Sequence, residues 1–383
     1  MMRFEHERID DDPPCGRLGF CLTTDLTGNG RPDVVVGGMG STRPVTVLGK
    51  RIKLRLLPVV GAAIERLESN VFWYENPGWE RHEVADCPDL SVGASLGDLT
   101  GTGRPDLVVG QNDGTGLYWF EVPPDPREPW TRHLITDAFR KYHDAAVADV
   151  DGDGEPEVVV CSQLSQVVCY FDVPDDPRAS PWPQECLHVV AAGLNVEGLS
   201  VADLDGDGES EIVAGPNVFR RGPDGGWDRE RLGDDWEWTR VAAADLDGDG
   251  ESEIVLTEGD LPYHGDRLGR VGVFDPPDWD VTVLDDDLFC PHTAQIADFD
   301  GDGRPDLLVG EMGLADNDDA RLFVYRNRGA DLDSDAGFER VEIGRGVPTH
   351  EAKPVDLTGD GALDVVGKSY GPDAHVDAWI RRD

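Results

Sequence analysis

The sequence predicts an all-β fold, a seven-bladed β-propeller with four-stranded antiparallel blades. The first observation is a nine-residue acidic phrase that returns seven times, with its first residue at Asp25, Asp98, Asp149, Asp203, Asp245, Asp298 and Asp356. The intervals run from 42 to 73 residues, a period typical of an array of one supersecondary unit. The second observation is that short apolar runs flank every phrase, while helical periodicity is nearly absent.

Each phrase is predicted to connect two strands of a hairpin. A β-branched run follows it, as in DVVVGG or EIVLTE, and a short strand precedes it, as in HTAQIAD. Runs of this length bounded by glycine are typical of buried strands. The glycines inside the phrase can adopt the positive φ that a sharp turn requires. A third and a fourth strand follow in each unit, as in VFWYENP and WERHEVAD.

The two ends of the chain predict how the ring closes. The seventh unit runs out after its third strand, HVDAWIRRD, whereas RFEHERID near the N-terminus matches the fourth-strand pattern of FERVEIGR. We expect the N-terminal segment to complete the last blade and so remove an exposed sheet edge. A single domain then spans residues 1–383, with an insertion at about 41–70 over one face.

The phrase also predicts cation sites, because its carboxylates at positions 1, 3, 5 and 9 are spaced like the oxygen ligands of a hard cation. Four phrases carry the full set, so we expect about four structural calcium sites with no part in chemistry. Their ligands would be Asp149, Asp151, Asp153 and Glu157; Asp203, Asp205, Asp207 and Glu211; Asp245, Asp247, Asp249 and Glu253; and Asp298, Asp300, Asp302 and Asp306. The other three phrases carry Thr or Asn within the set, and we expect side-chain hydrogen bonds to hold at least the first two of those turns.

Composition narrows the function classes. The formal net charge is −43, from 77 acidic and 34 basic residues, and such a field repels the phosphates of a nucleic acid. No stretch approaches about eighteen apolar residues, so we expect no membrane span. The acidic composition resembles that of proteins from halophilic archaea. Because the N-terminus shows no secretory-signal pattern, we expect a cytoplasmic protein.

A second set of residues is predicted on the face opposite the acidic loops. His143, His292 and His350 each stand six residues before the first Asp of their units, and Glu197 takes this place in the fourth unit. Because first strands line the channel of a propeller, these side chains should converge near its mouth. Three histidines and a carboxylate are a plausible site for zinc or manganese. A ring of polar groups that binds channel water is an equally good interpretation.

The segment of about 41–70 departs from the acidic background, with six basic and two acidic residues. It joins a second strand to a third, so it should project over the face that carries the histidines. It is either a lid or docking surface for an anionic ligand, or a hairpin packed on the rim or on another subunit.

The seven phrases resemble FG-GAP/VCBS repeats, which build the propellers of integrin α-chains and of many microbial carbohydrate-active proteins. The resemblance extends over essentially the whole chain and implies that the D-x-D-G-D-G-x-x-D/E loops bind calcium. WYENP and HTAQIADFDGDG are also similar to the propeller part of aldos-2-ulose dehydratases and some polysaccharide lyases. This second resemblance implies an activity on carbohydrates.

We therefore expect a metal-assisted carbohydrate lyase or dehydratase that performs β-elimination on a sugar or a uronate, with a small molecule or an oligosaccharide as its ligand. His264, Tyr370 or Lys368 would remove the proton, and Glu258 or Glu311 would assist the leaving group. The alternative is a non-catalytic propeller that binds a protein or glycan partner. The sequence leaves the substrate and the oligomeric state open.

Overall fold

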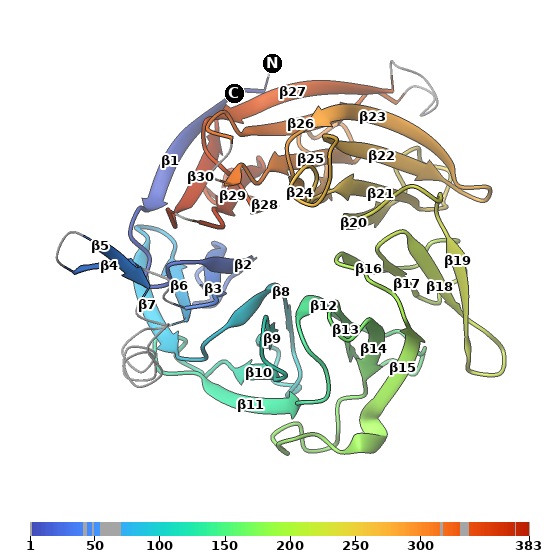
Figure 1. The fold of residues 1–383 in the computed structure, drawn as a ribbon, viewed down its shortest axis with the longest axis horizontal. Helices are drawn as coiled ribbons and strands as arrows, with labels where there is room; N and C mark the ends of the chain where they lie inside the picture. The colour runs from blue at the N-terminus through green and yellow to red at the C-terminus, as the bar shows by residue number, and fades with distance from the viewer. Residues whose placement is uncertain are drawn as a thin grey trace.

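The computed structural model describes residues 2–40, 44–47, 50–53, 70–314, 317–329, 337–371 and 373–382. Seven four-stranded antiparallel sheets surround a central axis as blades, which confirms the predicted seven-bladed β-propeller (Figure 1). A 3₁₀ turn, η3, occurs at Gln184–Cys186, and no α-helix occurs in the described ranges. Within those ranges, no helix has the length and apolarity to cross a membrane.

Six blades each use strands in chain order, with the first strand innermost (Figure 1). The first blade contains β2 (Leu18–Thr24), β3 (Asp33–Gly38), β6 (Val71–Glu75) and β7 (Glu80–Ala85). The second contains β8 (Leu90–Gly97), β9 (Asp106–Gln111), β10 (Leu117–Glu121) and β11 (Thr131–Thr136). The third contains β12 (Tyr142–Ala148), β13 (Glu157–Ser162), β14 (Val167–Phe171) and β15 (Leu187–Ala192).

The next three blades repeat this arrangement. The fourth contains β16 (Leu199–Ala202), β17 (Glu211–Ala214), β18 (Asn217–Arg221) and β19 (Trp227–Arg231). The fifth contains β20 (Thr239–Ala244), β21 (Glu253–Glu258), β22 (Gly269–Asp275) and β23 (Asp280–Leu288). The sixth contains β24 (Pro291–Ala297), β25 (Asp306–Glu311), β26 (Arg321–Asn327) and β27 (Phe338–Arg345).

The insertion between β3 and β6 contains a separate two-stranded sheet. Its strands are β4 (Pro44–Val47) and β5 (Lys50–Lys53), which pair antiparallel. The rest of the predicted basic segment up to residue 69 lies outside the described residues, as do the side chains of these two strands. The predicted role of the segment therefore stays a prediction.

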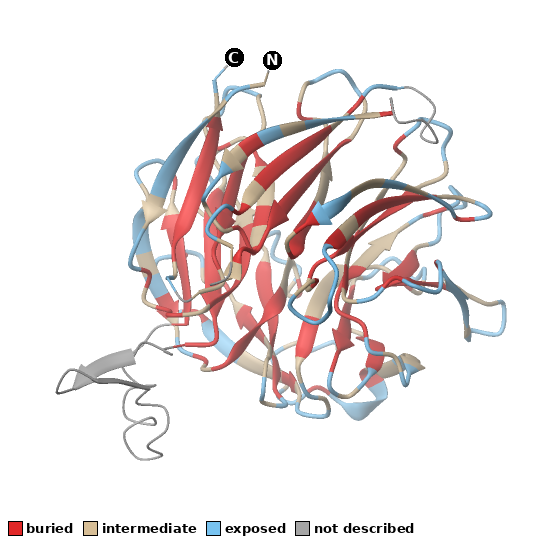
Figure 2. Ribbon diagram, turned by 45° about the horizontal axis from the view of Figure 1, so that its top comes forward, coloured by how far each residue is buried: buried red, intermediate tan, exposed pale blue. Residues whose placement is uncertain are grey.

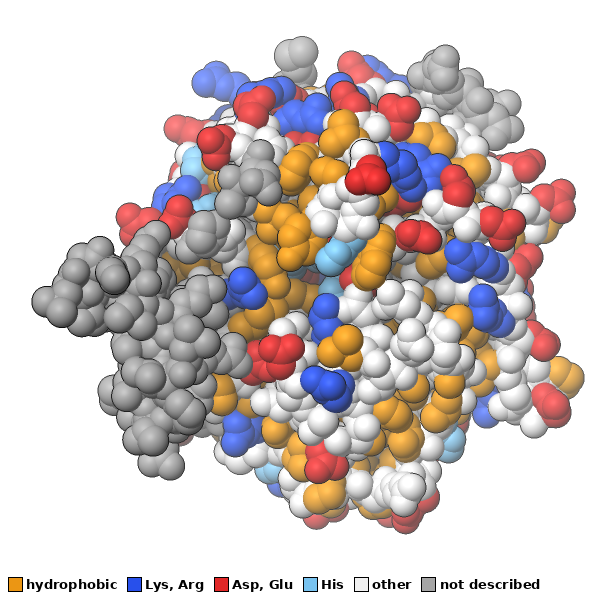
Figure 3. Space-filling view, viewed as in Figure 1, with side chains coloured by type: hydrophobic (Ala, Val, Ile, Leu, Met, Phe, Trp, Pro, Cys, Tyr) orange, Lys and Arg blue, Asp and Glu red, His pale blue; other side chains and the backbone are white. Residues whose placement is uncertain are grey.

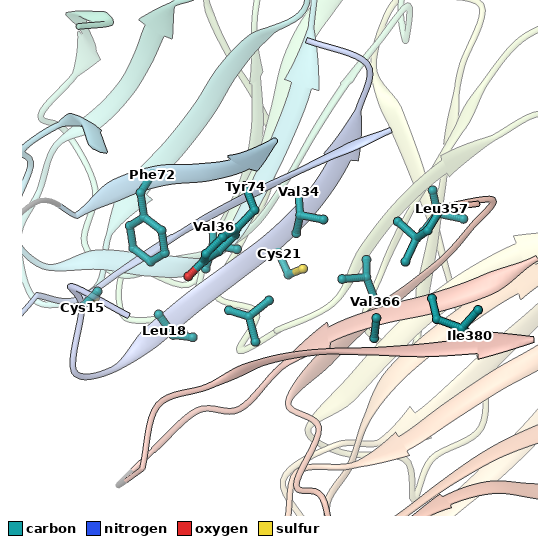
Figure 4. Packing of buried hydrophobic residues seen from close by; sticks show 13 residues of the cluster. Cys15, Leu18, Cys21, Val34, Val36, Phe72, Tyr74, Leu357, Val366 and Ile380 are labelled. Atoms are coloured by element: carbon teal, nitrogen blue, oxygen red, sulfur yellow. The ribbon is translucent and has the colours of Figure 1, made fainter. Parts of the chain in front are cut away.

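The core lies between neighbouring blades. Strands that follow the acidic loops, such as β13 and β25, are buried along their whole length, because each packs against a blade on both sides (Figure 2). Between the last and first blades, Leu18 and Val34 face Val366 and Ile380 (Figure 4). The seven cysteines, all within the described residues, are buried and form no disulfide, as expected for small apolar core residues.

The last blade confirms the predicted ring closure. It contains β28 (Glu351–Val355), β29 (Asp364–Lys368), β30 (Val376–Arg381) and, as its outer strand, the N-terminal β1 (Phe4–Asp10). β1 pairs antiparallel with β30. Asp377 on β30 is 1% exposed, and its Oδ1 lies 2.7 Å from Nε2 of His6 and 2.6 Å from Nε of Arg8. A buried carboxylate thus joins the two ends of the chain.

Replacing both His6 and Arg8 by alanine should lower the free energy of unfolding by about 1–3 kcal/mol, because the double variant takes two charged or polar partners from a buried carboxylate. Guanidinium denaturation at constant salt measures the change. The matched control is Arg382→Ala, which removes exposed pairs with Glu5 and Glu7 on the same outer strand and should change stability little. Equal losses in the two variants would contradict the role of Asp377.

Candidate functional site

The starts of the first strands bring the predicted ring of polar residues together at one end of the channel. His143 lies in β12 and His292 in β24, whereas Glu197 lies two residues before β16 and His350 immediately before β28. All four side chains are buried, with exposed fractions of 2–5%. Histidine side chains are visible near the centre of the face drawn in Figure 3. The position of these four residues at one end of the channel agrees with the predicted convergence near its mouth. Their roles stay predictions.

His143 and His292 share one tautomer. Nδ1 of His143 lies 3.1 Å from the carbonyl oxygen of Glu197, and Nδ1 of His292 lies 3.0 Å from the carbonyl oxygen of His350. A carbonyl only accepts, so Nδ1 carries the hydrogen in both rings and Nε2 remains an acceptor. Nε2 of His143 lies 3.7 Å from Oε1 of Glu197, and Nε2 of His292 lies 4.0 Å from Oδ1 of Asp260.

His350 is held differently, through Lys368. Nζ of Lys368 lies 2.6 Å from Nδ1 of His350 and also donates to the carbonyl oxygens of Leu18 and Gly19. A protonated Lys368 thus satisfies three acceptors, and His350 then carries its hydrogen on Nε2. The His350 ring stacks between those of His292 and Tyr370, with centroid distances of 4.0 and 4.6 Å.

The arrangement of His143, Glu197, His292 and His350 does not fit the transition-metal site predicted for them. Among the described residues, the sets of three or more possible ligand atoms within 4.8 Å of one another do not include these histidines. His350 is stacked between two rings, and its Nδ1 faces an amine that would repel a cation when protonated. The arrangement fits acid–base groups better than the ligands of one metal ion.

Burial shifts the proton affinities of this cluster. It lowers the pKa of all three histidines well below the usual range, and the nearby positive charge of Arg240 adds to the effect on His143 and His292. Burial also lowers the pKa of Lys368 to about 7. Burial, followed by the charge of Asp260, raises the pKa of Glu197 to about 8. Near neutral pH the cluster therefore holds neutral imidazoles, a protonated carboxylic acid and an amine close to half-neutral.

Glu197 also has an unused hydrogen-bonding atom. Gln163 donates to Oε1 of Glu197, but Oε2 is buried with no hydrogen-bond partner among the described residues. The side-chain oxygen of Gln163 is in the same state. Buried polar atoms without partners are rare, and a bound polar ligand would satisfy both of them.

Asp260, which was not among the predicted site residues, belongs to the same cluster. It lies in the loop between β21 and β22, and its carboxylate is 4.0 Å from Nε2 of His292 and 3.6 Å from Nε2 of His264. It therefore connects the exposed His264 with the buried ring. The signal that could have found it is the acidic residue four positions before His264 in a loop on the histidine face.

The geometry does not favour the acid roles predicted for Glu258 and Glu311, both 0% exposed. Nε of Arg270 lies 3.0 Å from the Glu258 carboxylate, and Nη2 of Arg321 lies 2.6 Å from that of Glu311. Burial alone would raise the pKa of Glu258, but hydrogen bonds from Arg267 and Arg270 outweigh it and lower the pKa. Each carboxylate instead joins the second strand of its blade to the third, because its arginine partner, Arg270 or Arg321, lies on the third strand.

The three predicted bases lie at different distances from the ring. Lys368 and Tyr370 both contact His350 directly. His264 is half-exposed and reaches the ring only through Asp260. Burial raises the pKa of Tyr370, so its phenol remains protonated at neutral pH and does not act as the predicted base, but it can donate its hydrogen.

Below the ring, the channel contains a cavity of about 300 Å³. Two ion pairs line it: Nη2 of Arg240 lies 3.0 Å from Oδ2 of Asp144, and Nζ of Lys353 lies 3.0 Å from Oε1 of Glu351. The channel interior is therefore polar and can hold water, in agreement with the simpler interpretation of the ring as a lining for channel water.

The acidic loops lie at the opposite ends of the first strands, and the four complete loops each bring three carboxylates together. Within 4.8 Å of one another lie the carboxylate atoms of Asp149, Asp151 and Glu157; Asp203, Asp205 and Glu211; Asp245, Asp247 and Glu253; and Asp298, Asp300 and Asp302. The three incomplete loops form no such set among the described residues. A further set, Glu75, Glu80 and His82, includes a carboxylate already paired with Arg127.

The remaining predicted ligands have backbone partners. Asp153, Asp207 and Asp249 each accept a hydrogen bond of 2.8 Å from the N–H two residues on, and Asp306 accepts one of 2.7 Å from Asn327. Burial, followed by neighbouring carboxylates, raises the pKa of Glu157 and Glu253 to about 7. The donor set and its spacing fit a hard, oxygen-binding cation.

Comparisons with known proteins agree with the fold. An FG-GAP-like repeat model matches residues 98–160 and 298–367. The chain is 26% identical over 285 residues to aldos-2-ulose dehydratase of Phanerodontia chrysosporium; the match covers 62% of this chain and 31% of that protein. The chain thus spans about a third of the length of this relative.

Two solved structures resemble the chain in fold. One is BBS1N in complex with ARL6DN, with a TM-score of 0.55, 11% identity, and coverage of 99% of this chain and 97% of that one. The other is virginiamycin B lyase from Staphylococcus aureus, with a TM-score of 0.56, 9% identity, and coverage of 99% of each chain. The chain is therefore a seven-bladed β-propeller that carries FG-GAP-like repeats.

Proposed function

We propose that the protein is a carbohydrate-active carbon–oxygen lyase or dehydratase that performs β-elimination at the channel mouth. The observation that carries the proposal is that a buried amine, Lys368, and a buried acid, Glu197, lie in one cluster with three neutral histidines. Burial lowers the pKa of Lys368 to about 7 and raises the pKa of Glu197 to about 8. An acid and a base with such affinities suit general acid–base catalysis near pH 7. The similarity to an aldos-2-ulose dehydratase supports the substrate class and the reaction.

Proton removal would begin at His350. With Lys368 neutral, His350 carries its hydrogen on Nδ1, so Nε2 can accept the proton from the carbon next to the sugar carbonyl, while the Nδ1 hydrogen passes to Nζ of Lys368. The electron pair of the broken C–H bond forms the new C=C bond. The carbonyl oxygen accepts a hydrogen bond from the phenol of Tyr370 as negative charge develops on it.

Departure of the leaving group would complete the elimination. The C–O bond at the β-carbon breaks with its electron pair on oxygen, and Glu197 gives that oxygen its proton. The products are an unsaturated carbonyl sugar and either water, for a dehydratase, or an alcohol, for a lyase. The Nε2 atoms of His143 and His292 accept hydrogen bonds from the sugar hydroxyls and so orient the sugar.

We also propose that the four complete acidic loops bind calcium. The carboxylates of each set would hold the ion, which neutralises their mutual repulsion and strengthens the turn between the first two strands. These sites lie at the end of the channel opposite the histidines and take no part in the elimination.

The rate of elimination should show a bell-shaped dependence on pH, with its maximum between about 7 and 8. Lys368 must be neutral, so the rate rises as its amine loses a proton near pH 7; Glu197 must be protonated, so the rate falls as it ionises near pH 8. The ultraviolet absorbance of the unsaturated product from a keto-sugar glycoside provides the measurement. A rate independent of pH between about 6 and 9 would contradict these roles.

The variant Lys368→Met should lose elimination by about 10²–10⁴-fold, because His350 then has no group to receive its Nδ1 proton. Arg382→Met is the control, since it also removes one positive charge, but from exposed pairs with Glu5 and Glu7 on the outer strand of the last blade, and it should leave the rate nearly unchanged. Thermal melting establishes that both variants are folded. Equal rates in the wild type and the Lys368 variant would exclude the proposed proton path.

The variant Thr358→Asp should bind one calcium ion more than the wild type. Thr358 replaces the third-position carboxylate in the loop that contains Asp356, Asp360 and Asp364, and its hydroxyl is buried without a partner among the described residues. Metal analysis after dialysis against calcium should give about four ions for the wild type and about five for the variant. Equal stoichiometry would contradict the assignment of calcium by carboxylate count.

A further inference from the structure

An aromatic cluster stands at the edge of the channel mouth, on the loop between β21 and β22 and on the residue before β20. Tyr263 is 63% exposed, and its ring meets that of His264 edge-on at a centroid distance of 4.5 Å. The His264 ring also stacks on Trp238 at 4.5 Å, with an angle of 29° between the planes. Trp238 has a φ of 53°, a conformation that a bulky residue adopts only when its surroundings hold it there.

The cluster is connected to the proposed site. Asp260, on the same loop, lies 3.6 Å from Nε2 of His264 and 4.0 Å from Nε2 of His292. Tyr263 and Asp260 also lie close enough to Tyr370 to raise the pKa of its phenol, after the larger effect of burial. A molecule that contacts Tyr263 therefore lies near the ring of histidines, with the side chains of His264 and Asp260 between Tyr263 and His292.

This combination of groups matches the chemistry of a sugar. A pyranose has a face of C–H groups that packs on an aromatic ring and a rim of hydroxyls that donate to carboxylates. Tyr263 and His264 provide exposed ring surface, and Asp260 provides an acceptor next to it. A single exposed aromatic side chain is common on protein surfaces. Here, however, the aromatic side chains of Tyr263 and His264 are followed in space by the carboxylate of Asp260 and then by the ring of histidines.

We propose that Tyr263, His264 and Trp238 form a stacking platform for a pyranose ring whose hydroxyls donate to Asp260. The inference rests on the proposed function and specifies its substrate: because the platform lies beside the ring of histidines, it holds a second sugar unit, bonded to the unit that undergoes elimination. The substrate is then an oligosaccharide or glycoside of at least two rings.

Binding of disaccharides tests the platform. Maltose, cellobiose and an unsubstituted uronic acid disaccharide are titrated into the wild type, with glucose as the single-ring comparison, and the change in tryptophan fluorescence is followed. We expect at least one disaccharide to bind more tightly than glucose. The variant Tyr263→Ala should weaken that binding about tenfold, whereas Tyr263→Phe should keep it, because stacking requires the ring and not the hydroxyl.

The matched control is Leu164→Ala, which removes another exposed apolar side chain, 53% exposed, from the loop between β13 and β14 on the same face. It should bind as the wild type does. Failure of every disaccharide to bind the wild type, or an equal loss in Leu164→Ala, would overturn the platform. Disaccharide binding by a protein that forms no unsaturated product from a keto-sugar glycoside would reject the elimination and keep the platform, whereas elimination with unchanged binding in Tyr263→Ala would reject only the platform.

Discussion

The organisation of this protein depends on the close packing of seven inner strands around one channel. At the channel mouth, Lys368 donates to the carbonyl oxygens of Leu18 and Gly19, where the last blade meets the first. A side chain at Gly19 would place its Cβ 2.1 Å from the carbonyl oxygen of Ser91, so only glycine allows the first and second blades to approach this closely. Because each inner strand runs along the channel from one face of the propeller to the other, its two ends lie on opposite faces. The acidic loops lie on one face, and the histidines, Lys368 and Glu197 lie on the other.

Burial at the mouth shifts the pKa values of Lys368 and Glu197 towards neutrality. A lysine that is exposed to water is protonated at neutral pH and a glutamate is ionised, but both states are costly in a packed ring of imidazoles. Burial therefore favours Lys368 as a base and Glu197 as an acid, without any unusual residue type. Below the ring, by contrast, Asp144 pairs with Arg240 and Lys353 pairs with Glu351. Both the mouth and the channel below it contain basic and acidic side chains. They differ because these side chains form ion pairs in the channel, whereas Lys368 and Glu197 form hydrogen bonds with neutral groups at the mouth.

The sequence predicted the fold well because the decisive information is local and repeated. Glycine positions, carboxylate spacing and strand length in one phrase determine one hairpin, and seven copies determine the ring. Counting back from the first Asp also predicted that His143, Glu197, His292 and His350 would meet. The partners of these residues depend on loops of different lengths, so counting could not find Asp260, the contact of Lys368 with His350, or the arginine clamps on Glu258 and Glu311.

In the proposed function, the three histidines, Lys368 and Glu197 together remove a proton from a sugar carbon and protonate the leaving group. The most direct measurement is NMR of a keto-sugar glycoside incubated in D₂O with wild-type protein from which bound metals have been chelated and to which calcium alone has been returned. Proton removal by the wild type should cause loss of the C–H signal next to the carbonyl and the appearance of vinyl signals from the unsaturated product, with neither change in His350→Phe. Retention of the C–H signal in the wild type, or identical spectra from the wild type and the variant, would contradict it.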